Sequence, residues 1–186
     1  MLKALLSRQI DAFERDFNYD ASYMRDLLDA DPWKFIKFSF LPSLGRGRRA
    51  PVEAIAAAGI VGTLAEDCGP CTQIGVDIAV RGGLDPAIMR AILAGDEAAM
   101  GETAALGYRF AKAVLARDMD EADLLRDEIL KRWGKAGLVD ISLSLTTARM
   151  YPTLKYGLGH GKACSRVIVA GVDAPFRKPV AEPLAA

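Results

Sequence analysis

Apolar residues recur at helical spacing along most of the 186-residue chain, and this periodicity limits the fold more than any other feature. In residues 121–133, Leu125, Ile129 and Trp133 follow one another every four positions, which places them on one face of a helix. Helical patterns also occupy several other segments: 2–17, 21–28, 32–38, 51–64, 84–93 and 103–117. We therefore predict an all-α fold.

Local signals predict where some of these helices begin and end. Asp85-Pro86 joins a capping residue to a proline that suits the first helical turn. Gly134 and Gly137 are expected to stop the helix over 121–133.

One segment is compatible with two structures. Residues 139–145 alternate between apolar and polar side chains, which is a strand pattern. As a helix, the same region places Leu138, Ile141 and Leu145 on one face. The weak pattern over 167–172 is the only partner strand available, so we predict a helix that continues to residue 150.

The chain divides into two predicted parts at a basic loop. Residues 1–50 are expected to form an N-terminal helical extension packed on the core, and 51–186 the core, with an irregular tail from Pro175. A break at Leu41-Pro42 precedes the loop, whose arginines are Arg46, Arg48 and Arg49. These side chains suit either an anion or plain solvation.

Composition narrows the function classes. With 24 basic and 24 acidic residues the net charge is zero, which argues against nucleic-acid binding. The charge-free stretch 54–65 is too short to span a membrane, and the N-terminal apolar run stops at Arg8, too early for a signal peptide. We expect a soluble cytoplasmic protein. A mean hydropathy of +0.13 hints at surface buried in an oligomer.

The chemistry-bearing motif is Cys68-Gly69-Pro70-Cys71. Two cysteines three positions apart share one helix face, and Gly-Pro between them fits a helix start. Unpaired N–H groups and the helix dipole stabilise a thiolate there, which predicts a redox-active pair. The neighbouring Glu66 is a candidate proton acceptor.

Two other interpretations of the cysteines stay open. Cys68 and Cys71 could join His160 and Cys164 in a tetrahedral zinc site, although such sites usually lie on turns rather than at a helix start. Alternatively, the two thiols only pack in the interior.

Cys-Gly-Pro-Cys is also the motif of thioredoxin, but the surrounding sequence excludes that fold. Thioredoxin-like domains place the motif after a buried strand, usually with Trp before the first cysteine. Here Asp67 holds that position, and an Ala-rich helical segment precedes it.

A different resemblance covers residues 51–159. The order and spacing of its segments are similar to those of the alkylhydroperoxidase D-like / carboxymuconolactone decarboxylase superfamily of all-helical proteins. The matching pieces are the helix ending in the cysteine motif, Arg81-Gly82-Gly83-Leu84-Asp85-Pro86-Ala87-Ile88, Ile92-Leu93-Ala94-Gly95-Asp96, the helix over 106–117 and Trp133-Gly134-Lys135-Ala136-Gly137-Leu138-Val139-Asp140-Ile141.

The redox branch of this superfamily places a Glu on the preceding helix and a His four residues after the second cysteine, as a proton relay. Here the His position is Gly75 and the Glu position is Ala56, so both relay groups are replaced. Glu53, one helical turn from Ala56, and Glu66 are the candidate substitutes, and His160 is a third from another helix. The resemblance assigns attack on the peroxide to Cys71, whereas helix-terminus reasoning favours Cys68.

The resemblance implies a peroxidase or disulfide reductase that acts on a hydroperoxide or disulfide and is restored by an external dithiol. It implies a homo-oligomer, either a trimer or a hexamer. It implies neither a metal nor an organic cofactor. Two rivals remain: a non-catalytic helical oligomer, and a decarboxylase of the same superfamily that binds an anionic lactone through basic side chains. The candidate cations for the latter are Arg81, Arg90, Arg109 and Arg149.

Overall fold

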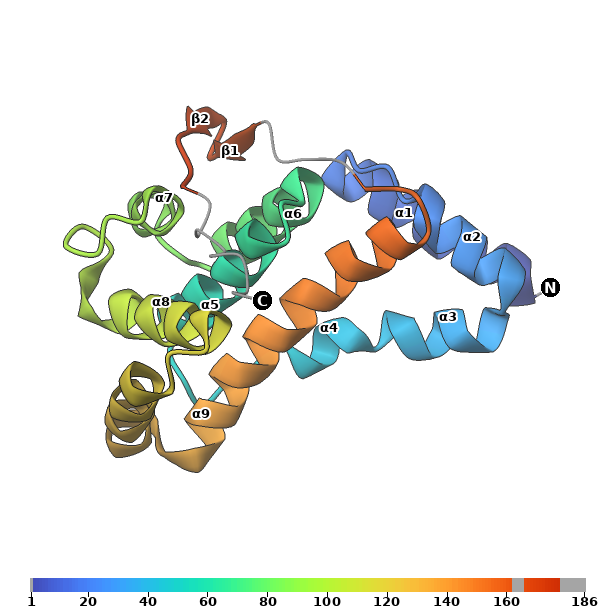
Figure 1. The fold of residues 1–186 in the computed structure, drawn as a ribbon. Helices are drawn as coiled ribbons and strands as arrows, with labels where there is room; N and C mark the ends of the chain where they lie inside the picture. Colours follow the sequence, from blue (N-terminus) through green and yellow to red (C-terminus); the bar gives the residue numbers. More distant parts are fainter. Residues whose placement is uncertain (1, 162–165, 178–186) are drawn as a thin grey trace, which may run out of the picture.

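The computed structural model describes residues 2–161 and 166–177 and confirms an all-α fold with one small hairpin (Figure 1). The elements in chain order are α1 (Leu2–Phe17), α2 (Ser22–Ala30), α3 (Pro32–Ser39), α4 (Leu41–Leu44), α5 (Val52–Ala65), α6 (Gly69–Arg81), α7 (Pro86–Ala94), α8 (Gly101–Ala116), α9 (Met119–Gly157), β1 (Val167–Val169) and β2 (Val172–Ala174). None of the described helices combines the length and the hydropathy of a membrane-spanning segment.

Helix α5 is the centre of the core. It packs against α6, α7, α8 and α9, and more than half of its residues are buried. Small side chains allow this close packing: a Cβ added to Gly107 of α8 would lie 2.4 Å from the carbonyl oxygen of Ala54. The Ala-rich sequence of α5 is therefore explained by close packing against four other helices.

Helix α9 changes direction at Gly134, where φ is 66° and ψ is −175°. The predicted stop is confirmed at this residue but is wrong for Gly137, which lies buried within the second half of the helix. The prediction of a helix over residues 139–150 is confirmed. Ile141 and Leu145 point into the core, as the helical face requires.

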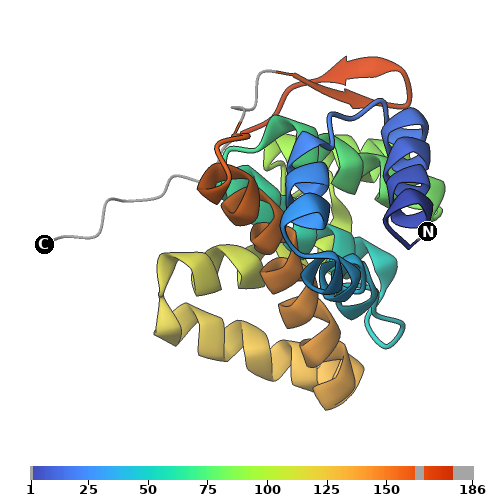
Figure 2. The same ribbon diagram turned by 90° about the vertical axis from the view of Figure 1, so that its right-hand side faces the viewer.

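The short hairpin pairs β1 with β2 in antiparallel register, Val167 opposite Ala174. The turn residues Ala170 and Gly171 both have positive φ, as a tight two-residue turn requires. The hairpin lies along one edge of the helical body (Figure 2). It docks on α6 through the Gln73 amide, which donates to Ile168 O at 3.0 Å and accepts from Ile168 N at 2.7 Å. The weak strand pattern over 167–172 therefore pairs locally, not with residues 139–145.

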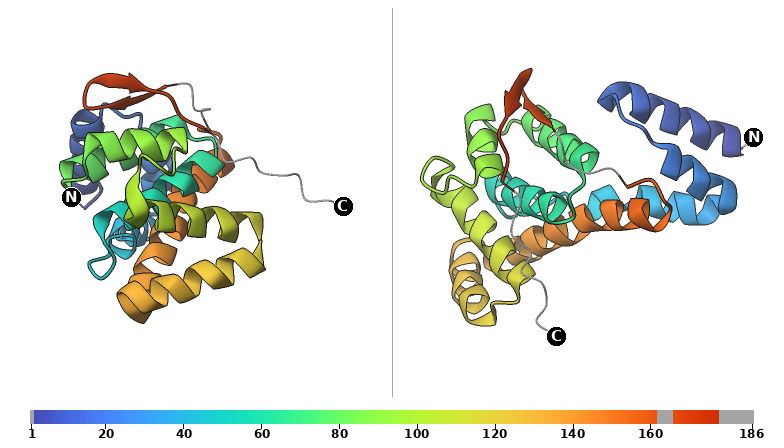
Figure 3. Two further views of the ribbon diagram at one scale, coloured as in Figure 1. Left: turned by 90° about the vertical axis from the view of Figure 1, so that its left-hand side faces the viewer. Right: turned by 45° about the horizontal axis from the view of Figure 1, so that its top comes forward.

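Helices α1 to α4 gather at one end of the molecule, beside the C-terminal half of α9, while α7 and α8 lie at the other end (Figures 1 and 3). The apolar side chains of the N-terminal helices form a separate buried cluster that includes Leu6, Ile10 and Tyr23. This cluster contacts the rest of the protein at Ile74 and Leu154. The break predicted at Leu41-Pro42 lies one residue earlier, at Phe40 between α3 and α4, and the short helix α4 then occupies Leu41–Leu44. Pro42 lies in its first turn, where a missing N–H costs nothing.

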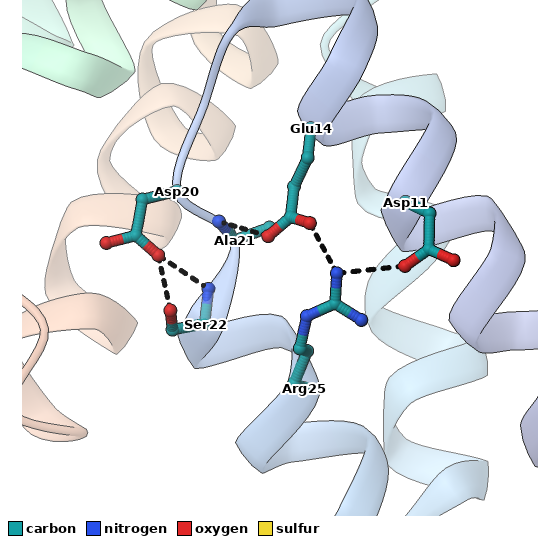
Figure 4. Close-up of polar contacts among 6 residues, drawn as sticks. All are labelled: Asp11, Glu14, Asp20, Ala21, Ser22 and Arg25. Atoms are coloured by element: carbon teal, nitrogen blue, oxygen red, sulfur yellow. Dashed lines mark hydrogen bonds and ion pairs between the residues drawn. The ribbon is translucent and has the colours of Figure 1, made fainter.

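Polar contacts hold α1 and α2 together (Figure 4). The guanidinium of Arg25 pairs with Asp11 at 2.9 Å and also with Glu14. The Glu14 carboxylate accepts a further hydrogen bond of 3.1 Å from the backbone N–H of Ala21. One arginine and one glutamate thus set the angle between the two helices.

Candidate functional site

Cys68 and Cys71 form a disulfide between Cα atoms 5.3 Å apart, within the usual range for such bonds. Both side chains are buried, with exposed fractions of 1% for Cys68 and 7% for Cys71. The bond lies where α5 ends and α6 begins. Asp67 makes this sharp turn possible by adopting a left-handed conformation with φ of 50°, which Asp tolerates better than most residues.

Cys68 is the N-cap residue of α6, as the Gly69-Pro70 pair predicted. Its carbonyl accepts hydrogen bonds from Thr72, at 2.9 Å from the backbone N–H and at 3.0 Å from the hydroxyl group. The first N–H groups of a helix have no acceptor within it, so the sulfur atoms lie at the positive end of the α6 dipole. This environment stabilises a thiolate when the bond is reduced.

Helix α9 braces the turn that carries the disulfide. The hydroxyl group of Tyr156 donates a hydrogen bond of 3.1 Å to the carbonyl of Asp67. Arg149 donates to the Glu66 carboxylate at 2.6 Å. The two residues before Cys68 are therefore both held by α9.

A cavity of about 470 Å³ opens beside the disulfide. Its floor consists of facing stripes on α5 and α6, and the N-terminal helices and residues 42–47 cover it. The floor residues are Val52, Ala56, Gly59, Ile60 and Thr63 from α5, and Cys71, Ile74, Gly75, Ile78, Ala79 and Gly82 from α6. Cys71 lines this cavity and Cys68 does not, so the two sulfurs differ in what can reach them.

The two positions that a relay would occupy both face this cavity. Ala56 and Gly75 lie in its walls together with Cys71, and neither carries a group that can transfer a proton. Space at Gly75 is limited, because even a Cβ there would come within 3.1 Å of the Ile60 side chain. The cavity therefore has methyl groups and backbone where a relay would have an acid and a base.

The predicted substitutes for the relay lie elsewhere. Glu53 is in the first turn of α5, about 18 Å along the helix from the end that leads to the cysteines. Glu66 is next to the disulfide turn but is ion-paired with Arg149 and does not line the cavity. His160 forms a 2.7 Å contact with Asp26 of α2. The structure brings Cys68, Cys71 and Glu66 together and leaves Glu53 apart.

The polar side chains that line the cavity include three tyrosines, Thr63 and Arg46. Sequence reasoning named Arg46 as a possible anion contact but missed the tyrosines and Thr63 as site residues. The hydroxyl group of Tyr151 is buried and has no hydrogen-bond partner among the residues that the structure describes. Burial raises the pKa of Tyr151 to about 12, and the charge of Arg46 acts in the opposite direction. A signal for Tyr151 existed, because the predicted helical face with Ile141 and Leu145 continues at helical spacing through Ala148 to Tyr151.

Two further tyrosines stand on the covered side of the cavity. Burial raises the pKa of Tyr19 to about 12 and raises that of Tyr23 further. The buried amine of Lys155 lies 4.7 Å from the centre of the Tyr19 ring and 5.5 Å from that of Tyr23. These cation–π contacts hold both rings in place from behind.

The arginines expected for an anionic lactone do not converge on one site. Arg81 contacts the Phe17 ring and the Asp16 carbonyl, Arg90 donates to Val169, and Arg109 pairs with Glu97. Arg149 is held by Glu66.

The zinc alternative falls partly outside the described residues, since Cys164 is not among them. Within 2–161 and 166–177, no three His, Cys, Asp or Glu side chains are grouped so that they could hold a metal ion.

Comparison of the chain with family models, with curated proteins and with solved structures found no match.

Proposed function

We propose that the protein is a thiol-dependent redox protein in which Cys68 and Cys71 alternate between dithiol and disulfide. One observation carries the proposal: the disulfide forms at a helix start, and only Cys71 borders the apolar cavity. A substrate that enters the cavity meets Cys71, and Cys68 is already within bonding distance to complete the cycle. This arrangement supports Cys71 as the attacking sulfur, in agreement with the family resemblance.

The cycle conserves atoms and electrons for either substrate class. With a disulfide, the Cys71 thiolate attacks one sulfur and expels the other as a thiolate, and Cys68 then displaces the first thiol from the mixed disulfide. With a hydroperoxide, Cys71 takes the outer oxygen as sulfenic acid, an alcohol leaves, and condensation with Cys68 releases water. In both cases an external dithiol returns two electrons and two protons.

The cavity favours a disulfide over a hydroperoxide. Breaking the O–O bond expels an alkoxide, which needs a proton donor nearby, and the relay positions Ala56 and Gly75 supply none. Breaking an S–S bond expels a thiolate, whose conjugate acid has a pKa of about 8.5, so no proton is needed in that step. We propose disulfide exchange as the faster reaction and hydroperoxide reduction as the slower.

Membership of the alkylhydroperoxidase D-like superfamily, a trimeric or hexameric assembly and a cytoplasmic location belong to the same proposal. The all-α fold and the cysteine pair at the start of a helix support the family assignment. Sedimentation equilibrium of the purified chain tests the assembly directly.

Thiol titration tests the redox proposal. The chain has three cysteines, so we expect three titratable thiols in the reduced protein and one after stoichiometric oxidation. An organic disulfide and an organic hydroperoxide are compared as oxidants, and a dithiol should restore the lost thiols. Cys68→Ser and Cys71→Ser should each abolish the two-thiol loss, whereas the matched control Cys164→Ser should keep it.

The variants also identify the attacking sulfur. If Cys71 attacks first, Cys68→Ser protein should still form a mixed disulfide with the substrate, and Cys71→Ser protein should not. Thiols that stay free with both oxidants would contradict the proposal and would favour the rival interpretation, a non-catalytic helical oligomer. Turnover of an anionic lactone that survives both substitutions would favour the decarboxylase.

A further inference from the structure

The cavity has an unequal distribution of polar groups. Its α5 and α6 walls and the covering residues Phe13 and Met24 are largely apolar. A phenol from α9 and a guanidinium from the basic loop also border it, and they interact with each other electrostatically. Ligand sites usually combine a mainly apolar cavity with a few polar groups that orient the ligand.

Tyr151 supplies a hydrogen-bond donor that nothing in the described protein satisfies. A buried hydroxyl group without a partner is unfavourable, and native proteins rarely retain one without a reason. This hydroxyl carries its proton at neutral pH, because the ordinary pKa of a tyrosine is already about 10 and burial raises that of Tyr151 to about 12, so it can donate a hydrogen bond. A ligand atom that accepts a hydrogen bond would remove the penalty.

Arg46 supplies the charge. Its side chain is exposed at the rim, and no described residue forms an ion pair with it. The loop that carries it is fixed, because one oxygen of Asp140 accepts hydrogen bonds from the backbone N–H groups of Arg48, Arg49 and Ala50 at 2.9, 2.7 and 3.3 Å. A cation held at the mouth of an apolar cavity attracts an anion that also has an apolar part.

The remaining space suits a hydrocarbon chain. The α5 stripe from Ala56 to Thr63 extends about 10 Å along the helix. The side chains of Ile60, Ile74 and Ile78 line the floor of the cavity along this stripe. A volume of about 470 Å³ is within the range of small-molecule sites.

We propose that this cavity binds a straight-chain monocarboxylate of medium length. The carboxylate accepts a hydrogen bond from the Tyr151 hydroxyl group and faces Arg46, while the hydrocarbon chain follows the slot between α5 and α6 toward Cys71. The proposal requires the cavity alone. It does not depend on redox cycling, although a bound chain would place its far end beside the reactive sulfur.

Calorimetric titration of the full chain in its disulfide form with decanoate tests the proposal. Decanoate should bind about fifteenfold more tightly than octanoate, because two more methylene groups are buried. Tyr151→Phe should weaken decanoate binding about tenfold, since a hydrogen bond to a charged group is lost. This variant should fold, because it removes only an unpartnered hydroxyl group.

Two controls separate the carboxylate from the chain. Arg46→Gln should weaken decanoate binding severalfold and leave decanol binding unchanged, whereas Arg48→Gln, in the same loop but not lining the cavity, should change neither. Equal binding of decanol and decanoate, equal effects of the two arginine substitutions, or no binding of either ligand would overturn the proposal.

A further variant separates this proposal from the redox proposal. Protein with both Cys68→Ser and Cys71→Ser should retain decanoate binding even though it cannot cycle. In the wild-type protein, decanoate binding without thiol cycling refutes only the redox function, and thiol cycling without decanoate binding refutes only the carboxylate site.

Discussion

Nε of Arg149 lies 2.6 Å from Oε1 of Glu66, so one of the two carboxylates that precede the disulfide in sequence is already engaged by α9. Only 19% of the Glu66 side chain is exposed, and it stands outside the cavity that borders Cys71. This geometry favours a structural role for Glu66 in bracing the turn, and we predict that Glu66 is not the proton acceptor.

Substitution of Glu66 by Gln is therefore expected to leave the rate of disulfide formation within about twofold of wild type and to lower the free energy of unfolding by less than about 1 kcal/mol. Stopped-flow thiol loss and urea unfolding measure the two effects. A rate reduced tenfold or more would restore Glu66 as the proton acceptor.

The contact between Gly107 and Ala54 predicts a strong effect of one added methyl group. Gly107→Ala should destabilise the protein by about 2 kcal/mol, because the new Cβ would meet the Ala54 backbone and force α5 and α8 apart. Gly157→Ala is the matched control, since nothing lies within 4 Å of a Cβ there. Similar urea midpoints for the two variants would contradict the packing argument.

The left-handed conformation of Asp67 predicts which residues can replace it. Asp67→Val should cost about 1–2 kcal/mol of unfolding free energy, because a β-branched side chain is strained at a φ of 50°. Asp67→Asn should cost much less, since Asn also tolerates this region. Thermal unfolding of the two variants in the disulfide form makes the comparison, and equal losses would mean that the charge, not the backbone, matters.

Alkaline pH should destabilise the protein through its buried tyrosines. Burial raises the pKa of both Tyr19 and Tyr151 from 10.0 to about 12, so the folded state holds these protons more tightly than the unfolded state does. The stabilisation is complete below pH 10 and is lost as pH rises toward 12. The slope of unfolding free energy against pH between pH 10 and 12 should be smaller in the Tyr19→Phe and Tyr151→Phe variants than in wild type. An unchanged slope would argue against the raised pKa values of these two tyrosines.

Asp140 is predicted to keep the basic loop closed against α9. Asp140→Ala removes the acceptor of three backbone hydrogen bonds, so trypsin should cleave after Arg48 or Arg49 faster than in wild type. Asp127→Ala, an exposed position on the same helix, serves as the control. Equal cleavage rates in the two variants would show that other contacts hold the loop.

Local signals predicted the helices well because helix formation depends mainly on neighbours in sequence. Asp85 caps α7 by accepting a hydrogen bond of 2.7 Å from Ala87 N, as Asp85-Pro86 indicated. Cys68 occupies the N-cap position of α6, as Gly69-Pro70 indicated, although its side chain makes no capping hydrogen bond. The hairpin turn at Ala170-Gly171 was missed because its strands are too short to show a clear alternation.

The features of the candidate site also fall into two groups, those that the sequence determined and those that only the tertiary structure decided. Sequence spacing alone determined that Cys68 and Cys71 can bond, since residues three apart at a helix start are always close. Only the tertiary structure decided that Cys71 borders a cavity, that Ala56 and Gly75 line it, and that Tyr151 and Arg46 meet there. Those relationships join residues up to 105 positions apart, and they depend on how the N-terminal helices, α5, α6 and α9 pack, which no local pattern encodes.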